Sequence, residues 1–296
     1  MIKTGISLSY PLITPELFRL LKKHPDIEIC QIEGAKDNST YHQELFETLQ
    51  EEIKGIPIAL SPEEMDFSEL DLYIGPSNKL LPENREFKAI FTDSGTGELG
   101  VCEFNRKALV RGATEVTLPD LPTILGALAL MPLAKNLLLN SPISVTMLLP
   151  VDRLGSRSSF TVPNSGLTSD NLNILREKIL TVLQNSFNSP VDISTICSTV
   201  SSFACAVFNT GVKISSEQAR ELFMDLYSDH RHIYFPEGTI SERMVIGTNK
   251  TIISLRNDSL GKLVVNVACD GLYKGGAGNI VHILNLLFGL DERTGL

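Results

Sequence analysis

The first 32 residues read as strand, helix and strand, and this order restricts the fold more than any other feature of the chain. The apolar segment Ile2–Leu8 predicts a short buried strand. The segment Thr14–Glu16 supplies a helix N-cap, a proline at the first helical position and an acid in the first turn. Asp26–Ile32 predicts the second strand. Because a helix that joins two strands usually makes them parallel neighbours, we expect a parallel sheet.

The rest of the chain divides into two halves of different character. Further strands are expected at Leu70–Ile74 and Ala89–Thr92. A long apolar helix is expected over Pro122–Leu139, with an interruption near Pro132 because proline removes a helical hydrogen bond. From Pro142 onward, strand signals dominate. The pattern predicts an α/β domain followed by an α+β domain.

The second half contains a predicted β-hairpin. Two strands flank a turn at Asn257–Ser259, and the alternation of Leu263, Val265, Val267 and Cys269 predicts one buried face. Other strand signals lie at Ile143–Leu149, Ile193–Phe208 and Met244–Ile246, and helices are expected over Thr168–Asn185 and Ser215–Tyr227.

The composition argues against nucleic acid and membranes as partners. The chain has 296 residues, and 26 Lys and Arg against 35 Asp and Glu give a net charge of −9, without a basic run that could follow a phosphate backbone. Apolar runs such as Ile124–Leu133 are shorter than the roughly 20 residues that span a bilayer. Five cysteines without paired spacing fit a reducing compartment, and no export signal is evident, so we expect a cytoplasmic protein.

Several motifs resemble those of one enzyme family. The C-terminal stretch "MVIGTNKTIISLRNDSLGKLVVNVACDGLYKGGAGNIVHILNLLFGL" has a Lys-Gly-rich element and the ending "NLLFGL". Further matches are "ELFRLLKKHPDIEI", "EFNRKAL" and "LPDLPTILGALALMPLAK". In these segments the chain resembles the NADP-dependent N-acetyl-gamma-glutamyl-phosphate reductases, which are relatives of the aspartate-semialdehyde dehydrogenases.

The resemblance implies a domain organisation and an assembly. A Rossmann-like domain should comprise residues 1–118 and be completed by the C-terminal helix 276–296. An α+β domain of the semialdehyde-dehydrogenase type, with a mixed sheet, should comprise residues 119–275. Because that sheet carries subunit contacts in the family, the resemblance implies a homodimer or homotetramer.

The residues that the family uses to bind its cofactor are replaced here. Its loop has glycines spaced G-x-x-G-x-x-G, and the three matching positions hold Leu8, Pro11 and Thr14. A leucine side chain hinders the approach of the pyrophosphate, and a proline removes an N–H donor. We therefore expect no bound cofactor, although NADP would be the cofactor if the family's activity were retained.

The residues of the family's chemistry are also replaced. The family forms a thioester with the cysteine of Pro-Gly-Cys-Tyr-Pro-Thr, but the matching segment Pro119–Thr123 reads "PDLPT", is one residue shorter and contains no thiol. The family's base is a histidine before a strand of the second domain, and the matching "LQNSFNSPVDI" contains none. The cofactor loop, nucleophile and base are thus missing together.

Only weak candidates could substitute for these groups. Cys102 is expected at the surface, where its acidic neighbours Glu98 and Glu103 disfavour a thiolate. His230 and His232 form a His-x-His pair without an evident third metal ligand. Four cysteines are expected to be buried and structural: Cys30, Cys197, Cys205 and Cys269. His24 and His42 are expected at the surface. Ser94, in the Asp93–Gly95 turn, has no nearby histidine in the sequence that could activate it.

The run Lys274-Gly275-Gly276-Ala277-Gly278 precedes an apolar helix and has two interpretations. Its glycines can form a tight turn that packs closely against neighbouring backbone. Alternatively, Lys274 and the N–H groups of Gly275, Gly276 and Gly278 can hold an anion such as a cofactor phosphate. The resemblance places this run at the domain junction near the cofactor.

Two functional hypotheses follow. The first is a divergent, catalytically inactive homologue that acts as a binding, regulatory or partner subunit, with an intact family reductase as one candidate partner. The second is an active NAD(P)-dependent acyl-phosphate reductase or semialdehyde dehydrogenase of arginine biosynthesis with relocated catalytic residues. In the first case, Ser9–Ile13 and Pro119–Pro122 should pack towards each other or towards Gly275–Gly278 and so close the cofactor cleft. Burial of Leu8, Leu12 and Leu121 would favour this closure.

Overall fold

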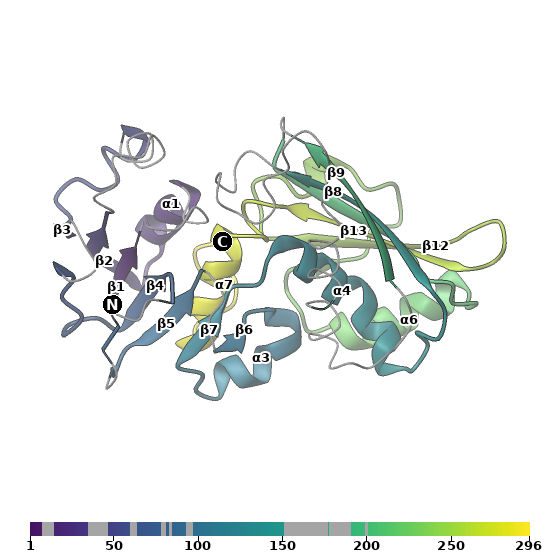
Figure 1. Ribbon diagram of the computed structural model, residues 1–296, viewed down its shortest axis with the longest axis horizontal. Helices are drawn as coiled ribbons and strands as arrows, with labels where there is room; N and C mark the ends of the chain where they lie inside the picture. Colours follow the sequence, from purple (N-terminus) through teal and green to yellow (C-terminus); the bar gives the residue numbers. More distant parts are fainter. Residues whose placement is uncertain are drawn as a thin grey trace. The chain divides into compact units, whose positions relative to one another are not determined.

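A computed structural model divides the chain into two compact units (Figure 1). The first unit comprises Met1–Pro119 and Gly276–Leu296, and the second comprises Asp120–Gly275. The structure describes residues 1–7, 15–34, 47–59, 64–77, 81–82, 85–92, 97–150, 177, 191–198 and 201–296.

The first unit is built on a seven-stranded sheet of the order β3-β2-β1-β4-β5-β7-β6, and every neighbouring pair is parallel. The strand order changes direction at β1, as in Rossmann-like folds. The predicted parallel sheet is confirmed. The strands are β1 (Ile2–Ser7), β2 (Ile27–Glu33), β3 (Ile58–Ala59), β4 (Leu72–Gly75), β5 (Lys88–Phe91), β6 (Glu98–Leu99) and β7 (Glu115–Thr117).

Both faces of this sheet are buried. On one face, α1 (Pro15–Lys23), α3 (Cys102–Val110) and α7 (Ala277–Leu287) share a core with Ile6, Leu72 and Ile90, and α7 contacts both α1 and α3. On the other face, a smaller core includes Tyr73, Ala89 and Phe91. Because successive strand residues point to opposite faces, β4 and β5 are apolar at almost every position, as expected for central parallel strands.

The second unit is built on a six-stranded mixed sheet of the order β11-β12-β13-β10-β8-β9. The β8–β9 and β11–β12 pairs are parallel, and the other neighbours are antiparallel. Among the described residues, α4 (Leu121–Lys135) packs against β10 and β13, and α6 (Ser216–Tyr227) packs against β12. The strands are β8 (Ile143–Pro150), β9 (Val191–Ser198), β10 (Phe203–Asn209), β11 (Ile233–Tyr234), β12 (Thr251–Asn257) and β13 (Leu263–Asp270).

The two strands of the predicted hairpin are confirmed, but the prediction of a single buried face was incomplete. Strands β12 and β13 pair antiparallel on either side of the predicted turn. However, β13 lies between β10 and β12, and Val264 is buried as well as Val265. Both faces of β13 are therefore covered.

Helix α4 continues through Pro132, so the predicted interruption was wrong. A proline at this position cannot donate to the carbonyl of Leu128, four residues earlier. The hydroxyl of Tyr227, at the end of α6, donates to that carbonyl oxygen at 2.9 Å. A side chain from the neighbouring helix thus replaces the missing backbone donor and keeps α4 intact.

A strand was predicted at Met244–Ile246 and a helix at Thr168–Asn185. The segment Met244–Ile246 is not a strand: Glu242–Met244 forms a 3₁₀ turn, and the chain then reverses at Gly247, where φ is +73°. Of the helix predicted over Thr168–Asn185, the structure describes only Glu177, which is helical.

Candidate functional site

The start of α4 is the position at which the resemblance places a catalytic cysteine. In this chain the residues there cap the helix and pack against neighbouring backbone. Asp120 is the N-cap, and its Oδ1 accepts a hydrogen bond from the backbone N–H of Thr123 at 2.9 Å. Leu121 is only 3% exposed. A Cβ atom added to Gly275 would lie 3.1 Å from the Leu121 Cβ and 2.4 Å from the Gly271 carbonyl oxygen. Leu121 and the two glycine backbones therefore form a closely packed contact.

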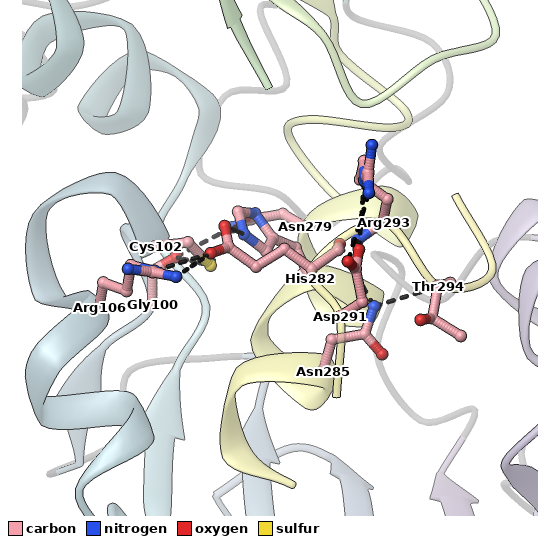
Figure 2. Close-up of polar contacts among 10 residues, drawn as sticks. Gly100, Cys102, Arg106, Asn279, His282, Asn285, Asp291, Arg293 and Thr294 are labelled. Atoms are coloured by element: carbon pink, nitrogen blue, oxygen red, sulfur yellow. Dashed lines mark hydrogen bonds and ion pairs between the residues drawn. The ribbon is translucent and has the colours of Figure 1, made fainter. Parts of the chain in front are cut away.

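Cys102 is buried, with 1% exposure, so the prediction that it lies at the surface was wrong. It is the first residue of α3 and faces α7 (Figure 2). Its Sγ donates to the Asn279 Oδ1 at 3.7 Å and contacts the Gly100 carbonyl at 4.0 Å, while the Asn279 Nδ2 donates to the same carbonyl at 3.1 Å. The Cys102 sulfur is therefore enclosed between α3 and α7 and lies away from the surface.

The other described cysteines also lack the features of an activated thiol. Burial raises the pKa of the Cys30 thiol, and the nearby Glu28 carboxylate raises it further. Burial likewise raises the pKa of the Cys205 thiol. Cys269 is buried within β13. The side chain of Cys197 lies outside the described residues. A nucleophilic cysteine normally has a lowered pKa, and neither resolved shift is in that direction.

The glycine run crosses from one unit to the other, since Gly275 ends the second unit and Gly276 begins the last segment of the first. Within the second unit, the side chain of Lys274 is fully buried. Gly275 has no space for a side chain because of the contacts described above. Within the first unit, Gly276 is the N-cap of α7, and Gly278 lies in its first turn; both are buried. The close approach at Gly275 is what the tight-turn interpretation requires, and anion binding by the run stays a prediction.

His230 and His232 are not part of a cluster of potential metal ligands within the described ranges. His232 is buried and His230 is half-buried, and across the described ranges no group of three or more His, Cys, Asp or Glu side chains could hold a metal ion. His24 is 3% exposed, so its predicted surface position was wrong. His42 and the turn Asp93–Gly95 lie outside the described residues.

A polar network along α7 was not foreseen from the sequence (Figure 2). The His282 Nε2 lies 3.0 Å from the Glu292 Oε2, and Arg106 of α3 binds the Glu292 Oε1 at 2.6 and 2.7 Å. The hydrogen bond with His282, followed by the charges of His282 and Arg106, lowers the pKa of the Glu292 carboxyl group despite its burial. These contacts tie the last residues of the chain to α3 and α7.

Asn285 extends this network towards α1. Its Nδ2 donates to the carbonyl oxygens of Glu292 and Thr294, and its Oδ1 lies 3.0 Å from the Nε2 of His24. The backbone N–H of Asp26 donates to the Nδ1 of His24 at 3.2 Å. All these groups belong to the first unit, and their contacts hold its C-terminal segment in place rather than creating an open site.

One hollow of about 500 Å³ lies in the second unit, at the ends of β8, β10 and β13. Its lining includes Ser144, Asp192, Asn209, Asp258 and Lys262. None of the predicted site residues lines it.

Comparisons with known proteins agree with this architecture. No family model matches the chain. Aspartate semialdehyde dehydrogenase II from Vibrio cholerae, solved in complex with ASA, has a TM-score of 0.69 and 17% identity, with 98% of each chain covered. A probable aspartate-semialdehyde dehydrogenase from Pseudomonas aeruginosa has a TM-score of 0.66 and 13% identity, covering 97% of this chain and 98% of that one. The fold is that of the semialdehyde dehydrogenases.

Relatives identified by sequence are reductases. The N-acetyl-gamma-glutamyl-phosphate reductases of Phocaeicola vulgatus and Parabacteroides distasonis are 28% and 27% identical to the chain, covering all of it and 98% of each relative. These full-length similarities support the assignment of the chain to the family of the N-acetyl-gamma-glutamyl-phosphate reductases and aspartate-semialdehyde dehydrogenases. Within the described residues, no helix is both long and apolar enough to cross a membrane.

Proposed function

We propose that this chain is a catalytically inactive member of its family and acts through binding, as a regulatory or partner subunit. The observation that carries the proposal is the start of α4. Where the family has its nucleophile, Asp120 caps the helix and Leu121 packs against Gly275. A carboxylate at this position cannot form the thioester from which the family's reaction proceeds.

The state of the described thiols supports the same proposal. Relocated chemistry would need an accessible cysteine with a lowered pKa. Cys102 is enclosed by α3 and α7, and the pKa values of Cys30 and Cys205 are raised by burial. No described thiol with a resolved pKa shift meets the requirement.

The residues around the expected cofactor position do not fit NADP. In an open parallel sheet, a nucleotide lies beyond the carboxyl ends of the strands. There the buried Glu33, at the end of β2, accepts a hydrogen bond from the hydroxyl of Ser7, at the end of β1. A carboxylate at this position repels a ribose 2′-phosphate. The first turn of α1 adds a further acid, Glu16, and has Pro15 in place of an N–H donor.

The assembly we propose is a homodimer or homotetramer, and an intact family reductase is a second possible partner. Cytoplasmic localisation belongs to the same proposal and is supported by the biosynthetic role that the relatives' name indicates. The closing of a cofactor cleft by Ser9–Ile13 stays a prediction, because that segment lies outside the described residues.

A cofactor titration tests the proposal. We expect no NADPH binding in the micromolar range by calorimetry, because each lost hydrogen bond to a charged phosphate removes about 1.5–3 kcal/mol. We also expect no reduction of N-acetyl-glutamyl phosphate and no phosphate-dependent oxidation of the semialdehyde. A family reductase with its glycine loop and cysteine intact is the positive control. A low-micromolar dissociation constant would contradict the proposal, and turnover that is lost on Cys102→Ser would instead support the active reductase of arginine biosynthesis.

A further inference from the structure

Asn249 and Thr251, two residues apart in the second unit, carry buried polar atoms for which the described residues provide no hydrogen-bond partner. Asn249 is 3% exposed and Thr251 is fully buried. Within the described part of the chain, the Oδ1 and Nδ2 of Asn249 and the Oγ1 of Thr251 make no hydrogen bond. Three unsatisfied atoms within three residues are unusual, because native proteins pair the large majority of such groups.

The surrounding backbone and side chains are well paired, so the loop is not loosely built. The N–H of Gly247 donates to the Asp270 Oδ2 at 2.7 Å, and the hydroxyl of Thr248 donates to the Val245 carbonyl at 2.7 Å. The N–H of Thr251 donates to the His232 carbonyl at 2.8 Å. The unsatisfied atoms are thus confined to two side chains held in an otherwise bonded segment.

We infer that Asn249 and Thr251 form an internal binding site for a water molecule. The guest must donate to the Asn249 Oδ1 and accept from its Nδ2, while the Thr251 hydroxyl can do either. A carboxylate or phosphate would repel the amide oxygen, and an ammonium group would repel the amide nitrogen's hydrogens. A small neutral group that both donates and accepts meets all three requirements, and the burial of both residues restricts its size to that of water.

The bound water links the loop after Gly247 to the first residue of β12. Asp270, at the end of β13, already holds Gly247 from the other side. The water therefore completes the connection of this loop to both strands of the hairpin. This role is independent of whether the chain binds a cofactor.

The substitution Thr251→Val tests the site because it replaces a hydroxyl by a methyl group of the same shape. Thr210→Val is the matched control: the Thr210 hydroxyl is buried and donates to the Leu263 carbonyl at 2.9 Å. If Thr251 binds water, Thr251→Val loses a satisfied hydrogen bond and should lower the Tm by about 2–4 °C. Thr210→Val should lower the Tm by at least as much, because the Thr210 hydroxyl donates to the Leu263 carbonyl and also accepts from the Val212 N–H at 3.3 Å. A truly unpaired hydroxyl would give the opposite sign for Thr251→Val, since removal of an unsatisfied polar group stabilises a protein.

A measurement on the unaltered protein keeps the inference testable if the variant fails to fold. We expect water-to-protein cross-relaxation at the side-chain amide protons of Asn249 in NMR spectra of the intact chain. Cross-relaxation at Asn249, together with a lowered Tm for Thr251→Val where that variant folds, supports the site. Its absence, or a Tm for Thr251→Val that is unchanged or raised, overturns it.

Discussion

Replacing Tyr227 by Phe should destabilise the second unit by an amount that depends on Pro132. The substitution removes only the hydroxyl that donates to the Leu128 carbonyl at 2.9 Å. Tyr227 is buried, so water cannot readily replace the lost donor. A buried carbonyl left without its donor costs about 1–3 kcal/mol, and we expect Tyr227→Phe to lower the free energy of unfolding by this amount.

A double-mutant cycle separates this effect from a loss of packing. Pro132→Ala restores a backbone N–H that can donate to the Leu128 carbonyl in an ordinary helical hydrogen bond. In the Pro132→Ala background, Tyr227→Phe should therefore cost less, and the difference between the two backgrounds should be about 1 kcal/mol. Urea unfolding followed by circular dichroism measures all four proteins. Equal costs of Tyr227→Phe in both backgrounds would refute the claim that the tyrosine replaces the donor missing at Pro132.

Three further outcomes are expected. Glu292→Gln should cost about 1.5–3 kcal/mol near pH 6. Because the pKa of Glu292 in the folded protein lies below its usual value, the stabilisation is present above that usual value and is lost as the pH falls through the folded pKa. Thermal melts of the two proteins should therefore converge in acid, and a constant difference would contradict this. Gly275→Ala should cost about 1–3 kcal/mol, whereas Gly238→Ala, whose Cβ meets nothing within 4 Å, should be nearly neutral; similar costs would argue against the close contact. Cys102→Ser should leave the number of fast-reacting thiols unchanged in the native protein and lower the number by one in urea, and a native thiol lost on substitution would show that Cys102 is accessible.

Local signals in the sequence were sufficient for the elements that begin with a side-chain cap. Ser215 forms a capping box with Gln218 before α6, and Asp120 caps α4. Helix α6 was predicted from its serine cap and apolar pattern, whereas α4 was predicted from its apolar run alone, without the Asp120 cap. Helix α3 was missed because it begins after Val101, which makes no side-chain cap, and because Asn105 departs from helical geometry.

The errors about burial have a different origin. His24 follows two lysines and precedes Pro25 and Asp26, a polar context that is typical of a surface. It is buried because Asn285 and Gly295, far along the chain, lie against it. Cys102 is likewise covered by Asn279 of α7. Neither contact could be derived from local pattern, since both depend on the C-terminal helix packing against α1 and α3.

The start of α4 offers a last test, because a thiol can be restored there by one substitution. In Leu121→Cys the new sulfur would lie next to the N-cap carboxylate of Asp120, which opposes a thiolate although the helix N-terminus favours it. We expect slow alkylation by iodoacetamide below pH 8 and no NADP reduction. In Asp120→Ser/Leu121→Cys the cap is kept and the charge is removed, so alkylation should become faster at the same pH. Since the double variant still lacks the glycine loop and the histidine base, it should remain without turnover. Turnover by either variant would mean that the cysteine alone had been lost and that the rest of the site still works.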